Sequence, residues 1–211
     1  MKVVILCGGR GARFREETES RPKPMIDVGG RPIVWDVMKL YASYGFRDFI
    51  LCLGYKGRMI KEYFLNYEAM NNDVTLTLGA SQRIQSHGNH QESDWTVTLA
   101  DTGEASLTGA RVKRIERFID EDTFLLTYGD GVGDVPIDRL VAFHRQHGKI
   151  GTMTAVHQPS RFGAVMAKDQ QVVQFLEKSS HGQGLINGGF FVFQRRFFDY
   201  LSAEEGCVLE R

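Results

Sequence analysis

The segment KVVILCGGRGARF, residues 2–14, joins a short apolar run to a loop rich in glycine. The apolar run at residues 2–6 is bounded by glycine, which is typical of a buried strand. Because glycine has no side chain, the main-chain N–H groups of such a loop can close on phosphate oxygens. The segment therefore predicts a strand that leads into a phosphate-binding loop.

Two basic residues follow the strand within one connected segment. Arg13 ends the glycine-rich loop, and Lys23 lies between two prolines, Pro22 and Pro24. Taken separately, an arginine or a lysine is more often a solvated surface charge. Two cations fixed beside a glycine loop suit a nucleoside triphosphate, whose phosphoryl groups must be held while one is attacked. Nucleotidyl transfer is the leading hypothesis on these residues alone.

Strands and helices alternate along the first part of the chain. Residues 33–44 carry apolar side chains at helical spacing after Pro32, and residues 57–67 predict a second helix. Residues 49–53 are apolar throughout, which is typical of a strand covered on both faces. The order resumes with strands at 124–128 and 151–156, a helix at 136–147, and later strands at 165–166, 172–176 and 190–193. We predict an α/β fold with a Rossmann-like, mostly parallel sheet flanked by helices.

The middle of the chain departs from that order, although all 211 residues are expected to form one domain. Residues 73–78 and 95–100 alternate apolar and polar side chains, as half-exposed strands do. Residues 81–94 are polar and predict a loop, and residues 111–118 predict a basic helix. We therefore expect a small antiparallel, β-rich insertion at about residues 73–118.

Composition excludes several classes of partner. Lys and Arg number 26 and Asp and Glu number 26, so the formal net charge is zero and the sequence pI is about 7.0. This balance argues against a broad surface for nucleic acid or for a membrane. Cys7, Cys52 and Cys207 are scattered without the spacing of a zinc site, which fits free thiols in a reducing compartment. With no signal peptide or membrane span visible, we expect a cytoplasmic protein.

The sequence gives less support to other functions of the glycine loop. A dinucleotide-binding loop needs an acidic residue at the end of the second strand, and Leu53 is followed by Gly54, Tyr55 and Lys56. An NAD-dependent oxidoreductase is therefore disfavoured. The P-loop pattern is not met either, because no Gly-Lys-Ser/Thr follows. A plain tight turn between strand and helix remains the alternative.

Asp130 is the candidate metal ligand. It lies between Gly129 and Gly131, directly after the strand predicted at 124–128. Ligands of parallel sheets bind beyond the carboxyl ends of the strands. Mg²⁺ in such places takes one or two carboxylates together with substrate phosphates. A turn aspartate that accepts its own backbone N–H groups is the alternative.

Several segments together resemble the sugar-1-phosphate nucleotidyltransferase family, and the likeness covers essentially the whole chain. The segments are the loop at residues 7–13, the lysine turn at 21–25, and the stretches 52–57, 61–64, 101–103, 108–111, 127–132 and 186–191. Residues 77–93 are the least alike. The resemblance implies a magnesium-dependent transfer of a cytidylyl group from CTP to glucose 1-phosphate. The products would be CDP-glucose and pyrophosphate, used in deoxysugar and surface-polysaccharide biosynthesis by a homo-oligomeric enzyme.

The resemblance also implies roles by position. Arg13, Lys23 and Asp130 would be catalytic, with Asp130 binding Mg²⁺. The nucleotide would be bound by Leu6, Cys7, Gly8, Gly9, Arg10, Gly11, Ala12, Arg13, Lys23, Thr102, Arg111 and Gly129. The sugar phosphate would be bound by Glu177, Lys178, Asn187 and Gly188.

Two departures from the family pattern leave alternatives open. Ser179 stands where the family has proline, and the family continues beyond Arg211 with a segment that carries a second metal-binding aspartate. A nucleotide-binding module, inactive through truncation, is therefore a second hypothesis. A uridylyl or thymidylyl transfer to a hexose 1-phosphate is a third, because cytosine and uracil differ only by an exchanged donor and acceptor on one edge.

Overall fold

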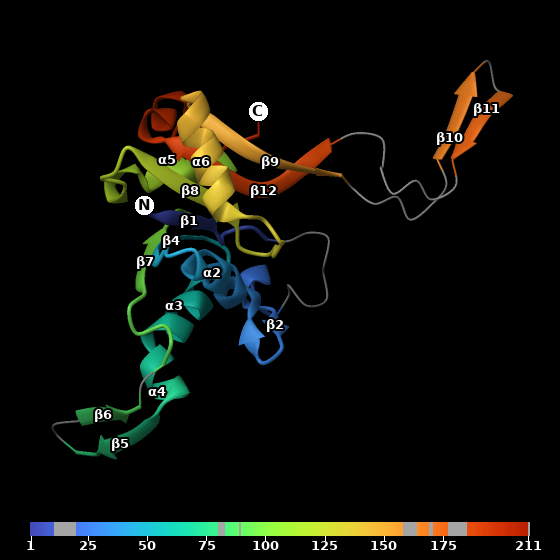
Figure 1. The fold of residues 1–211 in the computed structure, drawn as a ribbon. Coiled ribbons are helices and arrows are strands. Elements are labelled where there is room, and N and C mark those ends of the chain that lie inside the picture. Colours follow the sequence, from blue (N-terminus) through green and yellow to red (C-terminus); the bar gives the residue numbers. More distant parts are fainter. Residues whose placement is uncertain are drawn as a thin grey trace.

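A computed structural model of the chain describes residues 1–10, 20–79, 83–88, 90–157, 164–168, 171–176 and 185–210. Its centre is a six-stranded sheet with the strand order β7-β4-β1-β8-β12-β9. These strands are β1 (Val3–Leu6), β4 (Asp48–Leu53), β7 (Thr96–Asp101), β8 (Thr123–Tyr128), β9 (Gly151–His157) and β12 (Leu185–Gln194). Neighbouring strands from β7 to β8 are parallel, and β12 runs antiparallel to both β8 and β9. Helices flank this sheet, so the predicted fold class is confirmed (Figure 1).

Alternate side chains of β1 enter two hydrophobic cores on opposite faces of the sheet, as the two-residue period of a strand requires. Val3 and Ile5 belong to one core, whereas Val4 and Leu6 belong to the other. All four residues are buried. A continuous apolar run therefore occupies the interior of the sheet, with a layer of helices on each side.

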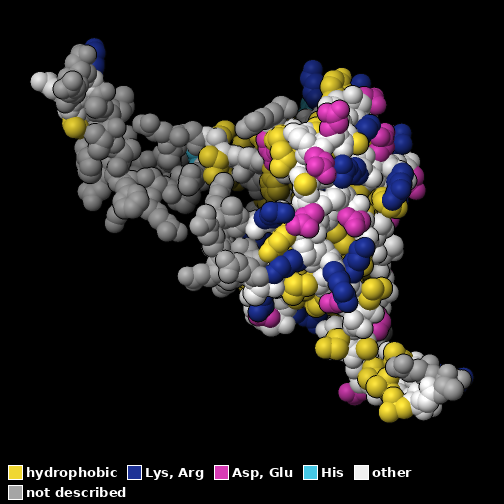
Figure 2. Space-filling view, turned by 180° about the vertical axis from the view of Figure 1, so that it is seen from behind, with side chains coloured by type: hydrophobic (Ala, Val, Ile, Leu, Met, Phe, Trp, Pro, Cys, Tyr) yellow, Lys and Arg dark blue, Asp and Glu magenta, His cyan; other side chains and the backbone are white. Residues whose placement is uncertain are grey.

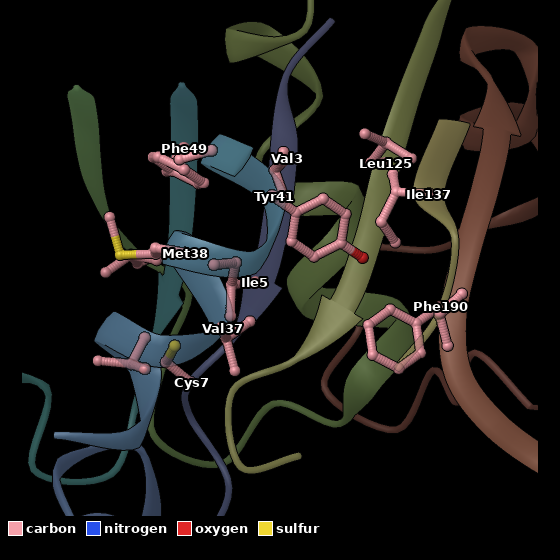
Figure 3. Packing of buried hydrophobic residues seen from close by; sticks show 14 of the residues in the cluster. Val3, Ile5, Cys7, Val37, Met38, Tyr41, Phe49, Leu125, Ile137 and Phe190 are labelled. Carbon is pink, nitrogen blue, oxygen red and sulfur yellow. The ribbon is translucent and has the colours of Figure 1, made fainter. Parts of the chain in front are cut away.

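The first core is closed by helices α2 (Ile33–Ser43), α3 (Gly57–Leu65) and α6 (Ile137–His147). Figure 3 shows Val37, Met38 and Tyr41 of α2 lying against the strand residues of this core. The second core is closed by α5 (Thr108–Arg114) and by the 3-10 helices η2 (Glu116–Phe118) and η3 (Arg195–Tyr200).

The remaining elements are small. They are η1 (Lys23–Met25), α4 (Tyr67–Asn71) and the strand pairs β2 (Asp27–Val28) with β3 (Arg31–Pro32), β5 (Asp73–Thr77) with β6 (Arg83–His87), and β10 (Ala164–Lys168) with β11 (Gln171–Leu176). Each pair is antiparallel. Hairpin β5–β6 projects from the body of the molecule beyond α4 (Figure 1).

The predicted insertion at residues 73–118 divides into two parts. Hairpin β5–β6 is indeed a separate antiparallel unit. Strand β7, however, pairs in parallel with β4 and belongs to the main sheet. The helix predicted at 111–118 begins earlier, at Thr108, and ends at Arg114 before η2.

The prediction of a loop at residues 81–94 was wrong in part, because residues 83–87 form strand β6. All five residues of β6 are exposed. Ile84 is the one large apolar residue of β6, so the sequence shows no alternation of apolar and polar residues there.

Candidate active site

The glycine loop, the metal-ligand candidate and the lysine turn meet at one edge of the sheet. Leu6 at the end of β1 lies level with Cys52 of β4 and with Tyr128 of β8. The segments that follow β1 and β8 therefore emerge side by side, and the Gly129 N–H donates to the Leu6 carbonyl at 3.0 Å. A cavity of about 210 Å³ opens at this edge, lined by Leu6, Gly8, Gly9, Lys23, Pro24, Ser106, Leu107, Thr108, Arg111, Tyr128 and Asp130.

Arg111 holds the floor of this cavity together. Its side chain is buried, and its guanidinium donates to the carbonyl oxygens of Gly8 at 2.9 Å, Leu53 at 3.1 Å and Gly103 at 2.7 Å. It also donates to the Thr102 hydroxyl at 2.9 Å and the Glu104 carbonyl at 3.2 Å. One cation thus ties together the segments that follow β1, β4 and β7.

Two glycines are required by the position of this guanidinium. A Cβ on Gly8 or on Gly54 would overlap the Arg111 guanidinium, so neither position accepts a side chain without displacing it. Gly9 differs, because a Cβ there would meet nothing within 4 Å. The backbone at Gly9 therefore faces open space, where a ligand can approach.

Thr102 and Arg111 were predicted to contact the nucleotide, and in the structure both side chains are held by hydrogen bonds to protein groups near the glycine loop. The Thr102 hydroxyl donates to the Leu53 carbonyl at 2.6 Å, and its side chain is buried. Arg111 borders the cavity, but its hydrogen bonds run to protein acceptors. Within the described chain, both residues fix the backbone that forms the cavity.

Lys23 and Asp130 form an ion pair at the cavity. Lys23 Nζ lies 3.1 Å from Asp130 Oδ2, and the exposed fractions of the two side chains are 20% and 41%. Lys23 begins η1, where the Met25 N–H donates to the Pro22 carbonyl at 2.8 Å. Because proline restricts backbone rotation, Pro22 and Pro24 help to fix the direction of this lysine. The pair predicted from separate segments is therefore adjacent in space.

The other predicted loop residues differ in exposure. Cys7 is buried, and its N–H donates to the Cys52 carbonyl at 3.0 Å. Burial raises the pKa of the Cys7 thiol, and it raises the pKa of Cys52 to about 12, so neither thiol acts as a nucleophile at neutral pH. Arg10 is mostly exposed and pairs with Glu104 at 2.9 Å.

The predicted sugar-phosphate residues Asn187 and Gly188 lie on β12, where Asn187 is exposed and Gly188 is partly buried. Asn187 Nδ2 donates to the Tyr128 hydroxyl at 3.1 Å, which connects it to a residue of the cavity wall. Gly11, Ala12, Arg13, Glu177 and Lys178 lie outside the described residues.

Several residues at the site were not predicted from the sequence: Ser106, Leu107, Thr108 and Tyr128 in the cavity wall, and Glu210 beside it. Thr108 and Tyr128 stand within segments that carried the family resemblance, which was the available signal. No comparable pattern marks Glu210.

The Asp130 carboxylate fits the role of a metal ligand. It already holds a cation, the Lys23 ammonium, and it lies at a cavity wide enough for phosphate groups. No group of three or more His, Cys, Asp or Glu side chains that could hold a metal ion occurs among the described residues. A divalent ion here would need oxygen ligands from a bound polyphosphate as well.

None of the helices in the described part of the chain is long and apolar enough to cross a lipid bilayer.

Comparison with known proteins gives the family. A sequence profile described as "Nucleotidyl transferase" matches residues 2–207. The chain belongs to the nucleotidyl transferase family. One member of this family is the glucose-1-phosphate cytidylyltransferase of Salmonella typhimurium, which is 48% identical over 202 residues, or 95% of this chain and 78% of that protein. Another is the probable glucose-1-phosphate cytidylyltransferase of Bacillus subtilis, 43% identical over 210 residues and covering 100% of this chain and 81% of that protein.

Solved structures share the nucleotidyl transferase fold at low identity. HddC from Yersinia pseudotuberculosis in complex with GMP-PN superimposes with a TM-score of 0.66 at 20% identity, covering 99% of this chain and 83% of that chain. A UDP-glucose pyrophosphorylase complexed with UDP-glucose gives a TM-score of 0.62 at 14% identity, covering 94% and 77% of the two chains.

Proposed function

We propose that this protein is a glucose-1-phosphate cytidylyltransferase, which transfers a cytidylyl group from CTP to glucose 1-phosphate. The observation that carries the proposal is the Lys23–Asp130 pair beside the glycine loop. It occurs in a chain that is 48% identical to a relative of that name. CDP-glucose and pyrophosphate are the products, in the service of deoxysugar and surface-polysaccharide biosynthesis.

The reaction needs charge neutralisation more than proton transfer. A phosphate oxygen of glucose 1-phosphate attacks the α-phosphorus of CTP, and the bond from that phosphorus to the bridging oxygen of pyrophosphate breaks. The nucleophile is already anionic near neutral pH, because the second pKa of a phosphate monoester is about 6. No general base is required. The repulsion between two polyanions is offset by fixed positive groups and by positioning.

The residues of this chain divide that work. Gly8 and Gly9 present backbone at the cavity, and Gly129 holds the neighbouring segment against Leu6. Lys23 supplies a positive charge at the phosphates, and we propose the same role for Arg13. Asp130 would hold Mg²⁺, whose contribution is to bind phosphate oxygens and neutralise their charge.

The sugar phosphate is assigned to the side of Asn187 and Gly188, with Glu177 and Lys178. A Cβ on Gly188 would lie 3.0 Å from the Thr154 carbonyl oxygen, so the bare backbone is needed there. Asn187 offers donor and acceptor groups for hydroxyls.

We also propose a cytoplasmic homo-oligomer that binds neither nucleic acid nor membrane. The three cysteines are free, which fits a reducing compartment. Basic and acidic side chains are interspersed on the face shown in Figure 2, without a large patch of one sign. In the same view, hydrophobic side chains gather on the projecting β5–β6 hairpin, which supports burial against another copy.

The test is pyrophosphate release from CTP, UTP or dTTP with glucose 1-phosphate and Mg²⁺. We expect CTP to give the highest rate. Lys23→Ala and Asp130→Ala should each lower the rate roughly 100- to 1,000-fold, because Lys23 would neutralise phosphate charge and Asp130 would hold the metal ion that does so. Arg58→Ala is the control, since its side chain is 89% exposed and pairs along its own helix with Glu62.

Other outcomes assign other functions. Faster release with UTP or dTTP would make the protein a uridylyl- or thymidylyltransferase. CTP binding in calorimetry without release from any triphosphate would make it a nucleotide-binding module. Wild-type rates in both cavity variants would refute the assignment of this site.

A further inference from the structure

The segment after η3 returns to the candidate active site and is anchored on the first turn of α5. The Leu107 N–H donates to the Glu205 carbonyl at 2.8 Å, and the Leu209 N–H donates to the Thr108 hydroxyl oxygen at 2.9 Å. A Cβ on Gly109 would lie only 2.7 Å from Cys207 Sγ, so this glycine permits the close packing. The anchoring brings Glu210 to the rim of the cavity.

The Glu210 carboxylate joins two residues of the cavity wall. One of its oxygens accepts from the Thr108 hydroxyl at 2.7 Å, and the other accepts from the Tyr128 hydroxyl at 2.7 Å. Tyr128 in turn accepts from Asn187 Nδ2 at 3.1 Å. Asn187 Oδ1 accepts from the Gly189 N–H at 2.8 Å. These contacts form one chain of hydrogen bonds, the Glu210–Tyr128–Asn187 relay.

The donor and acceptor of each hydrogen bond in the relay follow from the groups at its two ends, the Glu210 carboxylate and the Gly189 N–H. An ionised carboxylate only accepts hydrogen bonds, so Tyr128 must donate its single proton to Glu210. The Tyr128 oxygen is then left to accept from Asn187. The Gly189 N–H can only donate, which fixes Oδ1 of the Asn187 amide at the other end. The amide of Asn187 can therefore not flip without breaking two hydrogen bonds.

Packing supports the same arrangement. Gly189 has a positive φ of 83°, and a Cβ there would lie 3.0 Å from the Tyr128 ring. The ring thus lies directly against the backbone that carries Asn187. Burial, and next the hydrogen bond to Glu210, raise the pKa of the Tyr128 phenol, so it remains a donor at neutral pH.

We infer that Glu210 and Tyr128 are positioning residues that orient Asn187 toward the sugar phosphate. An asparagine amide carries two N–H donors, and the relay uses one of them. The second is held in a fixed direction for a hydroxyl or phosphate oxygen of the sugar phosphate. This inference rests on the proposed function in assigning Asn187 to that substrate.

The experiment compares Glu210→Ala with the wild type in the pyrophosphate-release assay, varying each substrate in turn. Losing the relay should raise the KM for glucose 1-phosphate about 10-fold, the value of one hydrogen bond, while the KM for CTP stays within about twofold. Glu210→Gln retains one acceptor oxygen and should give an intermediate KM. Glu205→Ala is the matched control, because it removes a carboxylate from the same segment. The Glu205 side chain has no hydrogen bond or ion pair among the described residues.

Tyr128→Phe removes only the hydroxyl and tests the relay if Glu210→Ala does not fold. It should raise the same KM by a similar factor. The second readout is the side-chain amide resonance of Asn187 in a ¹⁵N NMR spectrum, assigned with Asn187→Asp. This resonance should shift in Glu210→Ala and in Tyr128→Phe, but not in Glu205→Ala.

The two readouts separate the inference from the proposed function. An unchanged KM for glucose 1-phosphate, or equal rises in both KM values, overturns the positioning role. If the wild type releases no pyrophosphate from any triphosphate, the proposed function fails. The Asn187 resonance then still decides the relay: a shift in Glu210→Ala supports it and an unmoved signal overturns it.

Discussion

Arg111 carries its charge in the protein interior without a carboxylate partner among the described residues. Its burial is tolerated because five protein acceptors surround the guanidinium, four of them backbone carbonyls. Burial lowers the pKa of this group from its ordinary value, which leaves an arginine charged at neutral pH. The residue therefore links the stability of the fold to the shape of the cavity.

Replacing Arg111 by Met should destabilise the protein by on the order of 3 kcal/mol, because buried carbonyls lose their donor. Urea unfolding at neutral pH measures the change. Arg10→Met is the control, since the Arg10 side chain is 70% exposed and its surface ion pair is worth less than about 1 kcal/mol. Equal shifts of the unfolding midpoint in the two variants would contradict a structural role for Arg111.

Single site residues are predicted from the sequence where a short motif around them marks their chemistry. The Pro-Lys-Pro turn at Lys23 and the Gly-Asp-Gly segment at Asp130 predicted a cation and a carboxylate at the site, and the two side chains lie 3.1 Å apart. The contacts of Arg111 depend on loops that meet only in the folded chain. Glu210 reaches Tyr128 across 82 residues, a separation that no local pattern encodes.

Among the elements, helix α6 and strand β9 are joined by a histidine pair. Thr152 Oγ1 lies 2.8 Å from His144 Nδ1 and 2.6 Å from His147 Nε2. His147 Nδ1 accepts from the Lys149 N–H at 2.9 Å, so neutral His147 carries its proton on Nε2 and donates to Thr152. Thr152 then donates to His144. The His144 proton lies on Nε2, which is buried without a hydrogen-bond partner in the described part of the chain.

Protonation of His144 should therefore oppose folding. Burial, then the charges of His147 and Arg145, lower its pKa in the folded state. A base with a depressed folded pKa binds a proton more readily when unfolded, so stability is lost as the pH falls below about 6.5. The melting temperature should drop between about pH 7.5 and about pH 5.5, and His144→Gln should reduce that drop.

His87→Gln is the control for the acid effect, because His87 is exposed on strand β6. It should leave the pH-dependent drop in melting temperature as in the wild type. An identical drop in His144→Gln and the wild type would exclude His144 as a source of acid sensitivity.

Elements with a regular pattern of apolar residues are the ones that the sequence predicts well. Helix α2 was predicted at residues 33–44 and runs from Ile33 to Ser43, because its apolar stripe packs on the sheet. Strand β6 was missed because Ile84 is its one large apolar residue, which gives no alternating pattern. Strand β7 was found but assigned to the insertion, since pairing with β4 depends on tertiary contacts.

At the scale of the whole molecule, the β5–β6 hairpin projects from the body and exposes apolar side chains. Leu76 and Ile84 are directly opposite each other in its register, with exposed fractions of 49% and 55%. A two-stranded hairpin standing alone is marginally stable in water. An exposed pair of large apolar side chains on such a hairpin fits a contact with a second copy of the chain.

Replacing Leu76 and Ile84 by residues of like charge should dissociate the proposed homo-oligomer. The double variant Leu76→Glu with Ile84→Glu should sediment as a smaller species than the wild type in analytical ultracentrifugation, because burying two unpaired carboxylates at an interface is costly. Thr75→Glu with Gln85→Glu makes the same charge change on the neighbouring register pair, whose side chains point to the opposite face. That control should sediment like the wild type. A wild-type protein that sediments as a monomer at every concentration would refute assembly, and equal dissociation of both double variants would refute the assignment of the Leu76–Ile84 face.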